Sequence, residues 1–79
     1  MRLAQHEKEA LRVIAGRPQG MDASTVASRI GWNRRSVGTK LLSLEKRGLL
    51  TREYQSEWRM YSWTLSENAK LNPEWWRDD

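Results

Sequence analysis

Apolar residues in the first part of the chain recur at the three- and four-residue spacing of an amphipathic helix. Ala10, Leu11 and Ile14 form the apolar stripe, which predicts a helix over roughly residues 4–15. Gly16 follows this pattern directly and suits the end of the helix. The chain is therefore expected to open with one helix followed by a loop.

Two further helices are predicted downstream, and each begins after a good N-cap residue. Asp22 is placed to cap a short helix near residues 23–30, and Asn33 to cap a longer helix near 34–47. Gly48 then suits the position just past the longer helix. The apolar residues that define the buried stripes of these two helices are Val26, Ala27, Ile30, Val37, Leu41 and Leu44.

The face of the longer helix that points away from its buried stripe is mostly polar and basic. With Val37 set at zero and a step of about 100° per residue, the remaining residues divide into a far side and two flanks. The far side carries Arg35, Thr39, Leu42, Ser43 and Lys46, and the flanks carry Arg34, Ser36 and Lys40. Gly38 weakens the helix by about 1 kcal/mol relative to Ala, so its presence needs a reason. Close approach of a partner supplies one reason, and tight packing against a neighbouring segment supplies another.

The pattern changes after the longer helix to two short runs rich in apolar, aromatic and Thr residues. Residues 49–54 and 58–65 predict the two strands of a hairpin, separated by residues 55–57. Alternation along the second strand predicts an inner face of Tyr61, Trp63 and Leu65 and an outer face of Met60, Ser62 and Thr64. Two tryptophans are expected in the core, namely Trp32 in the turn before the longer helix and Trp63.

A last pair of short helical turns is predicted at the C-terminal end. Ser66 is placed to cap a helix over residues 67–71, and Pro73 suits the start of a further turn. That turn carries Trp75 and Trp76, and two adjacent exposed aromatic residues are unusual on a monomer. We expect one of them to fold back on the core and the other to contact a partner.

These elements predict a mainly α fold with a small β-hairpin, in the α+β class. A chain of 79 residues has room for one core. Residues 1–79 are therefore expected to form a single domain, with its core at about 5–67 and a C-terminal tail at 68–79.

The residue types in the chain exclude several classes of protein. There is no cysteine and one histidine, His6, so neither a disulfide framework nor a metal site is expected. No run of about 18 apolar residues predicts a membrane span, and the N-terminus is too polar for a signal peptide, which favours a cytoplasmic protein. Neither an enzymatic activity nor a cofactor is expected, because the chain has no nucleophile–base pair, glycine-rich phosphate loop or carboxylate pair.

The positive charge is concentrated in the middle of the chain. The net charge is +4 at pH 7, but residues 29–52 alone hold seven basic residues against Glu45, a local excess of +6. The flanking segments 1–28 and 53–79 carry +1 and −3. Such a block indicates a polyanionic partner, and a solvated face of lysine and arginine is the alternative.

Caps, glycines and apolar residues follow one another in a distinctive order over residues 20–50. The order begins with a polar cap, followed by a short helix, a glycine and an apolar residue. A second polar cap then opens the longer helix. That helix and the strand after it continue the pattern with Val37, Leu41, Leu44, Arg47, Gly48, Leu49 and Leu50. This order resembles the winged helix-turn-helix family, in particular its bacterial MarR- and ArsR-type regulators. The resemblance covers about residues 5–67 and implies three helices, a two-stranded wing and a short C-terminal helix.

The resemblance implies sequence-specific binding of double-stranded DNA by a small transcriptional regulator of bacterial or phage origin, with the helix near 34–47 in the major groove. Arg35 points most directly away from the buried stripe and is the first choice for bonding guanine. Arg59 lies beside the hairpin tip, where winged proteins often carry a basic residue for the minor groove, and its alternative is an ion pair with Glu57 or Glu53. The full set of candidate DNA contacts is Arg29, Arg34, Arg35, Ser36, Thr39, Lys40, Lys46, Arg52 and Arg59.

Two other functions remain open, because a fold alone does not decide function. In the first, the winged helix is a protein–protein interaction module with Leu42, Trp75 and Trp76 as contacts. In the second, it is an RNA-binding or replication-related winged helix. MarR-type regulators dimerise through long helices flanking the winged core, and here only residues 1–4 and 68–79 lie outside it. The expected partners are therefore duplex DNA and, through the C-terminal tail, either a second copy or another protein.

Overall fold

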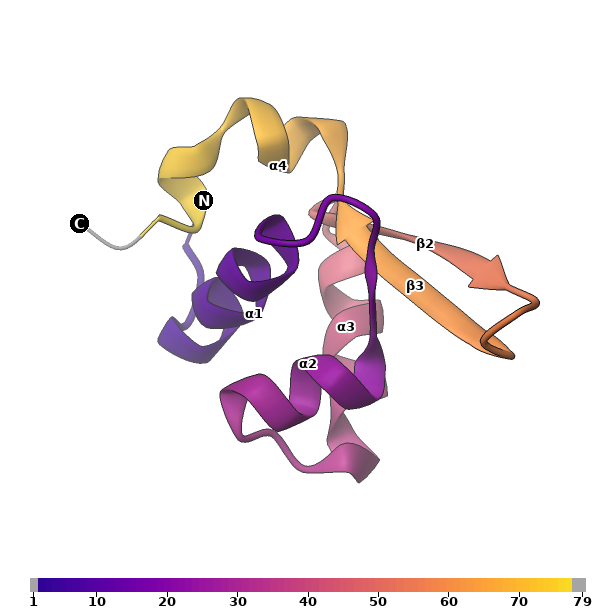
Figure 1. Cartoon of the computed structure of the whole chain (residues 1–79). Coiled ribbons are helices and arrows are strands. Elements are labelled where there is room, and N and C mark those ends of the chain that lie inside the picture. The colour runs from indigo at the N-terminus through magenta and orange to yellow at the C-terminus, as the bar shows by residue number, and fades with distance from the viewer. Residues whose placement is uncertain (1, 78–79) are drawn as a thin grey trace.

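Helices dominate residues 2–77, the part of the chain that the computed structural model describes. Three helices come before a β-hairpin, a two-residue strand lies between the first two helices, and two short helices follow the hairpin (Figure 1). The elements are α1 (Gln5–Ala15), β1 (Met21–Asp22), α2 (Ala23–Ile30), α3 (Arg34–Lys46), β2 (Leu50–Gln55), β3 (Met60–Leu65), α4 (Glu67–Leu71) and the 3₁₀ helix η1 (Pro73–Trp75). Within residues 2–77, no helix has the length and apolar character needed to cross a membrane.

The helices pack their apolar stripes around one core. The buried residues of α1, α2 and α3 are Ala10, Leu11, Ile14, Val26, Ala27, Val37, Leu41 and Leu44. Ile30 packs against this core but is only half-buried. Leu49, Leu50, Trp63 and Leu65 close the core from the side of the hairpin. The three predicted helices and nearly all of their buried positions are therefore confirmed.

Polar side chains begin α2 and α3 where the sequence predicts. Asp22 Oδ2 accepts a hydrogen bond from the backbone N–H of Thr25 at 3.1 Å. Asn33 Oδ1 accepts one from the backbone N–H of Arg35 at 2.8 Å. Each bond satisfies a donor that has no partner inside its own helix, so both helices have a fixed starting residue.

The end of α3 is set by Gly48. This residue adopts a left-handed conformation with φ 80°. Its N–H donates to the carbonyl of Glu45 at 2.9 Å, and the N–H of Leu49 donates to the carbonyl of Leu44 at 3.0 Å. The helix therefore stops at Lys46, one residue before the predicted end, and the chain turns into the hairpin.

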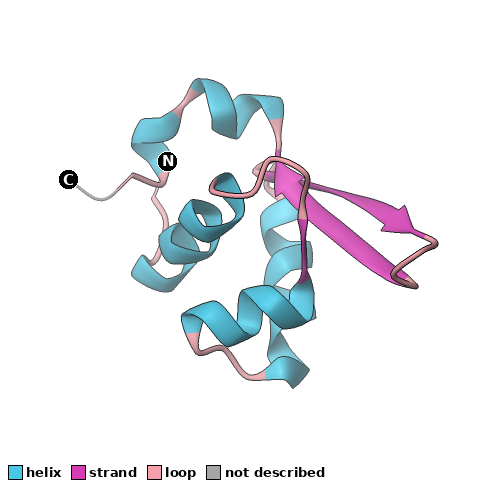
Figure 2. Ribbon diagram, in the orientation of Figure 1, coloured by secondary structure: helices cyan, strands magenta, loops and turns pink. Residues whose placement is uncertain are grey.

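The predicted hairpin is present, and β1 adds a third strand that the sequence does not reveal. The sheet has the order β1-β3-β2, and both pairs of strands are antiparallel. Met21 pairs with Trp63, and Asp22 pairs with Ser62. A strand of two residues has no alternation to detect, and its partner is distant in sequence. Figure 2 shows β2 and β3 extending beyond the helices as a wing.

The predicted burial along β3 is wrong at two positions. Ser62 was expected to face outward but is buried, because the segment before β1 covers that side of the sheet. Its Oγ donates to the carbonyl of Gln19 at 3.4 Å, and a Cβ at Gly20 would collide with the same hydroxyl. Tyr61 was expected to face inward but is 43% exposed, because it lies nearer the wing tip than the core extends. Trp63, two residues further along the same face, is buried as predicted.

Two other tryptophans differ from their expected positions. Trp58 was placed in the second strand, but the turn covers residues 56–59 and β3 begins only at Met60. Trp32 is half-buried at the edge of the core rather than inside it. Its ring meets the ring of His6 edge-to-face at 5.7 Å between centroids.

The C-terminal helices pack back on the core. Trp75 and Trp76 are both half-buried against it, whereas the sequence suggested this position for one of them. Trp76 Nε1 donates to the carbonyl of Ala69 at 2.8 Å. Arg12 Nη1 of α1 donates to the carbonyl of Trp76 at 3.0 Å. The first bond holds Trp76 against α4, and the second joins the C-terminal segment to α1.

The N-cap of α2 gives a prediction for stability and its pH dependence. Partial burial disfavours the charged form of Asp22, but hydrogen bonds from the Thr25 hydroxyl and from backbone N–H groups outweigh it and hold the pKa of Asp22 below its usual value. We expect Asp22→Ala to lose about 1 kcal/mol of stability at neutral pH. Because the folded-state pKa is lowered, this stabilisation is present at neutral pH and is lost as the pH falls through the folded-state pKa.

Thermal unfolding of the wild type and two variants checks this prediction. Asp22→Ala should melt several degrees below the wild type at pH 7, and the gap should narrow in acid. Asp22→Asn keeps a capping oxygen that does not titrate, so it should stay close to the wild type at neutral pH. A gap between Asp22→Ala and the wild type that is the same at pH 7 and in strong acid would contradict the role of the charge.

Candidate nucleic-acid interface

The far side of α3 is the exposed face that the helical spacing predicts. Its five residues, Arg35, Thr39, Leu42, Ser43 and Lys46, are all exposed, while the opposite stripe is buried in the core. At 1.5 Å per residue, the strip from Arg35 to Lys46 is about 16 Å long. α3 therefore presents one continuous surface, basic at both ends, to any partner that approaches from this side.

The flanks of α3 are held by contacts with α2 and with the turn before α3. Arg34 Nη2 donates to Ser24 Oγ of α2 at 2.7 Å. Ser36 Oγ donates to the carbonyl of Asn33 at 3.1 Å. Lys40 Nζ lies 5.5 Å from the ring centroid of Trp32. Arg34 is therefore held against α2, and Ser36 and Lys40 against the turn before α3, whereas Arg35 and Lys46 extend from the exposed strip.

Two cations of the basic central block are engaged in ion pairs. Arg47 Nη1 lies 3.0 Å from Glu7 Oε2, and Arg52 Nε lies 3.3 Å from Glu45 Oε2. The Arg52 guanidinium also covers the ring of Tyr61 at 4.6 Å from its centroid. No ion pair among residues 2–77 involves the other five cations of the block, Arg29, Arg34, Arg35, Lys40 and Lys46. Within the central block, the unpaired cations therefore lie on α2 and α3.

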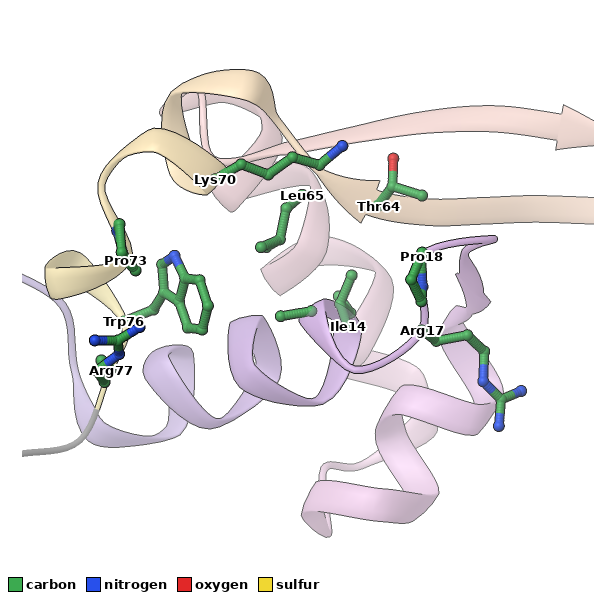
Figure 3. A pocket seen from close by; sticks show the side chains of 10 residues that line it. Ile14, Arg17, Pro18, Thr64, Leu65, Lys70, Pro73, Trp76 and Arg77 are labelled. Atoms are coloured by element: carbon green, nitrogen blue, oxygen red, sulfur yellow. The ribbon is translucent and has the colours of Figure 1, made fainter.

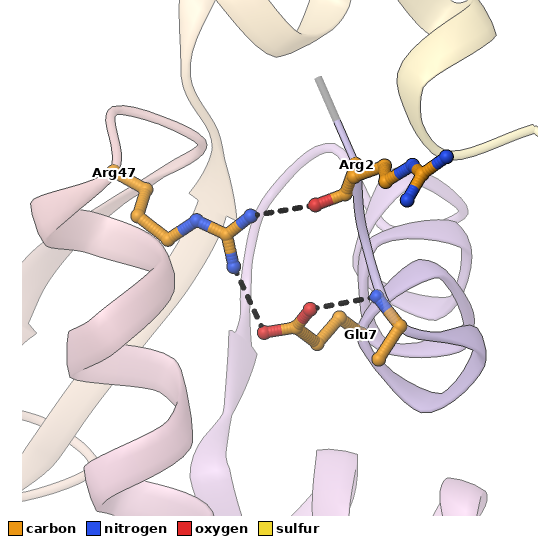
Figure 4. A network of polar contacts seen from close by, with 4 residues as sticks. Arg2, Glu7 and Arg47 are labelled. Carbon is orange, nitrogen blue, oxygen red and sulfur yellow. Dashed lines mark hydrogen bonds and ion pairs between the residues drawn. The ribbon is translucent and has the colours of Figure 1, made fainter.

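Glu7 joins the start of α1 to the end of α3, a contact that sequence reasoning missed (Figure 4). Its Oε1 accepts a hydrogen bond from the backbone N–H of Ala4 at 2.8 Å, while its Oε2 binds Arg47. Arg47 Nη2 also donates to the carbonyl of Arg2 at 3.0 Å. The two side chains are distant in sequence, so no local pattern could have paired them. The network therefore holds the C-terminal end of α3 in place.

The wing carries an exposed apolar patch, and its basic and acidic residues balance. Arg59 lies in the turn at its tip, in a left-handed conformation with φ 54°. The expected alternative, an ion pair of Arg59 with Glu57 or Glu53, does not occur among the described residues. The exposed apolar side chains of the wing are Tyr54, Trp58, Met60 and Tyr61, and the rings of the two tyrosines meet edge-to-face at 5.4 Å. Strand alternation alone did not reveal this patch, because it assigned Tyr61 to the core.

A hollow of about 330 Å³ lies between α3 and the wing. The side chains around it come from the start of α2, from α3 and from β2 and β3; they include Ala23, Ser24, Leu42, Arg52, Met60 and Tyr61, with Gly38 at its edge. A Cβ built on Gly38 would have no heavy atom within 4 Å. Tight packing against a neighbouring segment therefore does not explain this glycine.

A second hollow of about 400 Å³ lies between the end of α1 and the C-terminal segment (Figure 3). Ile14, Leu65 and Trp76 provide its apolar surface, and the Arg17 side chain in Figure 3 points away from the indole. No residue of α3 lines this hollow, so it is separate from the candidate interface. Within residues 2–77, no three His, Cys, Asp or Glu side chains gather in a way that could hold a metal ion.

This arrangement of helices and wing is found in solved structures of bacterial regulators. PcaV, a transcriptional regulator from Streptomyces coelicolor, matches 95% of the chain with a TM-score of 0.82 at 21% sequence identity. The chain has the winged helix-turn-helix fold. FabT from Streptococcus pneumoniae matches 87% with a TM-score of 0.80 at 23% identity, and MepR from S. aureus matches 91% with a TM-score of 0.83 at 18% identity. Both of these were solved in complex with DNA.

The likeness to MarR-family regulators is one of structure, and it covers part of each of them. This winged helix-turn-helix chain spans 53% of PcaV, 48% of FabT and 60% of MepR, about half of their length. Its sequence matches no family model and no curated protein. At identities this low, the comparisons establish the fold, and the site must be argued from its own residues.

Proposed function

We propose that this winged helix-turn-helix chain binds double-stranded DNA as a small transcriptional regulator, with α3 in the major groove. The observation that carries the proposal is the exposed strip of α3, which holds Arg35 and Lys46 free of ion pairs while the opposite stripe is buried. A major groove admits one α-helix, and α3 presents an exposed outer face with a cation at each end. FabT and MepR, which have the same fold, were crystallised with DNA and support this use of it.

The cations around α3 divide into two roles. Arg35, in the first turn of α3 and exposed, is placed to bond guanine through two parallel hydrogen bonds. Arg29 lies on α2 and Arg34 bonds Ser24 of α2, and we expect both to contact the phosphate backbone. Lys46 is expected to contact a phosphate at the other end of the strip. Thr39 and Ser36 add hydroxyl groups that could bond bases or phosphates. Arg52 and Lys40 already contact aromatic rings, so their contribution to binding is expected to be smaller.

Tight specific binding by such a small domain is expected to need a second copy or a partner protein. One winged domain offers few base contacts, and dimers of this class bind two half-sites on one face of the duplex. The C-terminal segment with Trp75 and Trp76 is the surface we propose for that contact, since its outer sides remain half-exposed. A regulator of this kind would act in the cytoplasm, where bacterial DNA lies.

Salt dependence tests the proposal directly. The purified chain is titrated with random-sequence duplex DNA at several salt concentrations, and tryptophan fluorescence reports binding. If about five phosphate contacts form, the slope of log affinity against log salt should lie near −4 to −5, since each contact contributes about −0.9. Absence of binding at low salt would refute DNA binding by this chain alone.

The exposed apolar patch on the wing favours a second candidate function, that of a protein–protein interaction module. Tyr54, Trp58, Met60 and Tyr61 are all exposed, and exposed apolar clusters commonly mark protein contacts. In that case the wing would bind the partner and the basic strip would only keep the chain soluble. A Trp58→Ala variant that binds DNA normally but no longer supports regulation would assign this separate role to the wing.

A further inference from the structure

We propose that the hollow between α3 and the wing selects thymine, by packing Leu42 against the C5-methyl group of that base in the major groove. The inference rests on the proposed function and names the base that one part of the same surface selects. It goes further because the proposed function relies on charged contacts, whereas this contact to a base edge is apolar and adds sequence preference without adding charge.

Leu42 interrupts an otherwise polar strip. Its side chain is 37% exposed and lines the hollow together with Gly38, Met60 and Tyr61. Along the helix axis it lies about 10 Å beyond Arg35 and about 6 Å before Lys46, given a rise of 1.5 Å per residue. Leu42 thus provides an accessible apolar surface that lies between two cations on the same face of α3.

Gly38 makes the flank of Leu42 accessible. The two residues lie four positions apart and so share one side of α3. No side chain stands at position 38, and no heavy atom lies within 4 Å of where its Cβ would be. An external group can therefore come close to the helix backbone beside Leu42. This access accounts for a residue that weakens the helix by about 1 kcal/mol relative to Ala.

The pattern of charge identifies the occupant as duplex DNA. Arg35 and Lys46 at the two ends of the strip suit phosphates or acceptor groups on bases, and the apolar centre between them suits a methyl group. Thymine is the base with an apolar group on its major-groove edge. A second copy of this chain would bring its own cations against these, and like charges at close range repel. The hollow therefore suits a thymine-containing site better than self-association.

The test replaces thymine by deoxyuridine, which pairs identically and lacks only the methyl group. Preferred duplexes are selected from a random library with the full chain, and each thymine is then replaced singly. We expect about fourfold weaker binding at one or two positions, the effect of losing one buried methyl group, and little change at the others. Leu42→Ala should bind the thymine and uracil duplexes equally, while Leu42→Met should keep the preference. Leu71→Ala is the matched control, because Leu71 lies on α4 and is 74% exposed. It should keep the preference for thymine.

The outcomes separate the inference from the function on which it rests. Equal binding of thymine and uracil duplexes with a normal salt slope overturns the inference and leaves DNA binding intact. A preference that persists in Leu42→Ala, or a selection that enriches no thymine at a fixed position, also overturns it. Self-association that is lost in Leu42→Ala, with an unchanged thymine preference, assigns the hollow to a second copy instead. Absence of any duplex binding overturns both proposals together.

Discussion

Replacing Arg35 by Glu is expected to weaken duplex binding at least 100-fold at low salt without destabilising the fold. A bidentate arginine–guanine contact contributes roughly 1–3 kcal/mol of discrimination, and the new carboxylate adds repulsion from nearby phosphates. Arg35 lies in the first turn of α3, where an acidic residue interacts favourably with the helix dipole by about 0.3–1 kcal/mol. The variant should therefore melt at or above the temperature of the wild type. Fluorescence titration and thermal unfolding on one preparation measure both quantities.

Two matched variants test separately whether the position of the charge matters and whether the paired hydrogen bonds of Arg35 matter. Arg17→Glu makes the same change in net charge on the loop after α1, beside the second hollow and away from α3, and should reduce binding only slightly. Arg35→Lys keeps the charge but loses the paired hydrogen bonds, so the salt slope should persist while sequence preference declines. If Arg35→Glu binds within threefold of the wild type, α3 is not the reading element and the proposed interface is wrong.

The helical part of the molecule was predictable because its determinants are local. Asp22 and Asn33 act as caps on their own helices, and Gly48 closes α3 through bonds within one turn. The stripe that includes Leu41 is buried because residues three and four apart share a helix face. The same arithmetic predicted which residues of α3 form its exposed strip.

The parts that were not predictable depend on contacts between distant segments. Ser62 is buried because β1 and the residues before it cover the sheet, and nothing in the hairpin sequence signals that strand. Arg47 counts as a free cation in the sequence, but Glu7 from α1 neutralises it. Tyr61 follows the correct strand alternation, yet the core ends before it does. Alternation assigns a side chain to a face, whereas burial also requires another segment opposite that face.

The second large effect concerns the C-terminal segment. We expect Trp76→Ala to lower the stability of the chain by about 2–3 kcal/mol, somewhat less than the roughly 3–5 kcal/mol typical of a fully buried tryptophan, because Trp76 is half-buried. For a domain of this size that loss lowers the melting temperature by about 10–20 °C. The indole packs beside Ile14 and Leu65 and bonds the carbonyl of Ala69 through Nε1. Trp76→Phe keeps most of the packing and loses that bond, so it should lose only about 1 kcal/mol.

Protein concentration distinguishes this internal role from a contact between copies. If Trp76 acts within one chain, the melting temperature of both wild type and Trp76→Ala should be independent of concentration. DNA binding measured well below the melting temperature should then be nearly unchanged, because the hydrogen bonds of Trp76 go to α1 and α4. If Trp76 instead joins two copies, the wild-type melting temperature should rise with concentration and the variant should lose that dependence. Its affinity for a two-half-site duplex would then fall steeply while its affinity for a single half-site stayed the same, which would place the dimer contact on the C-terminal segment.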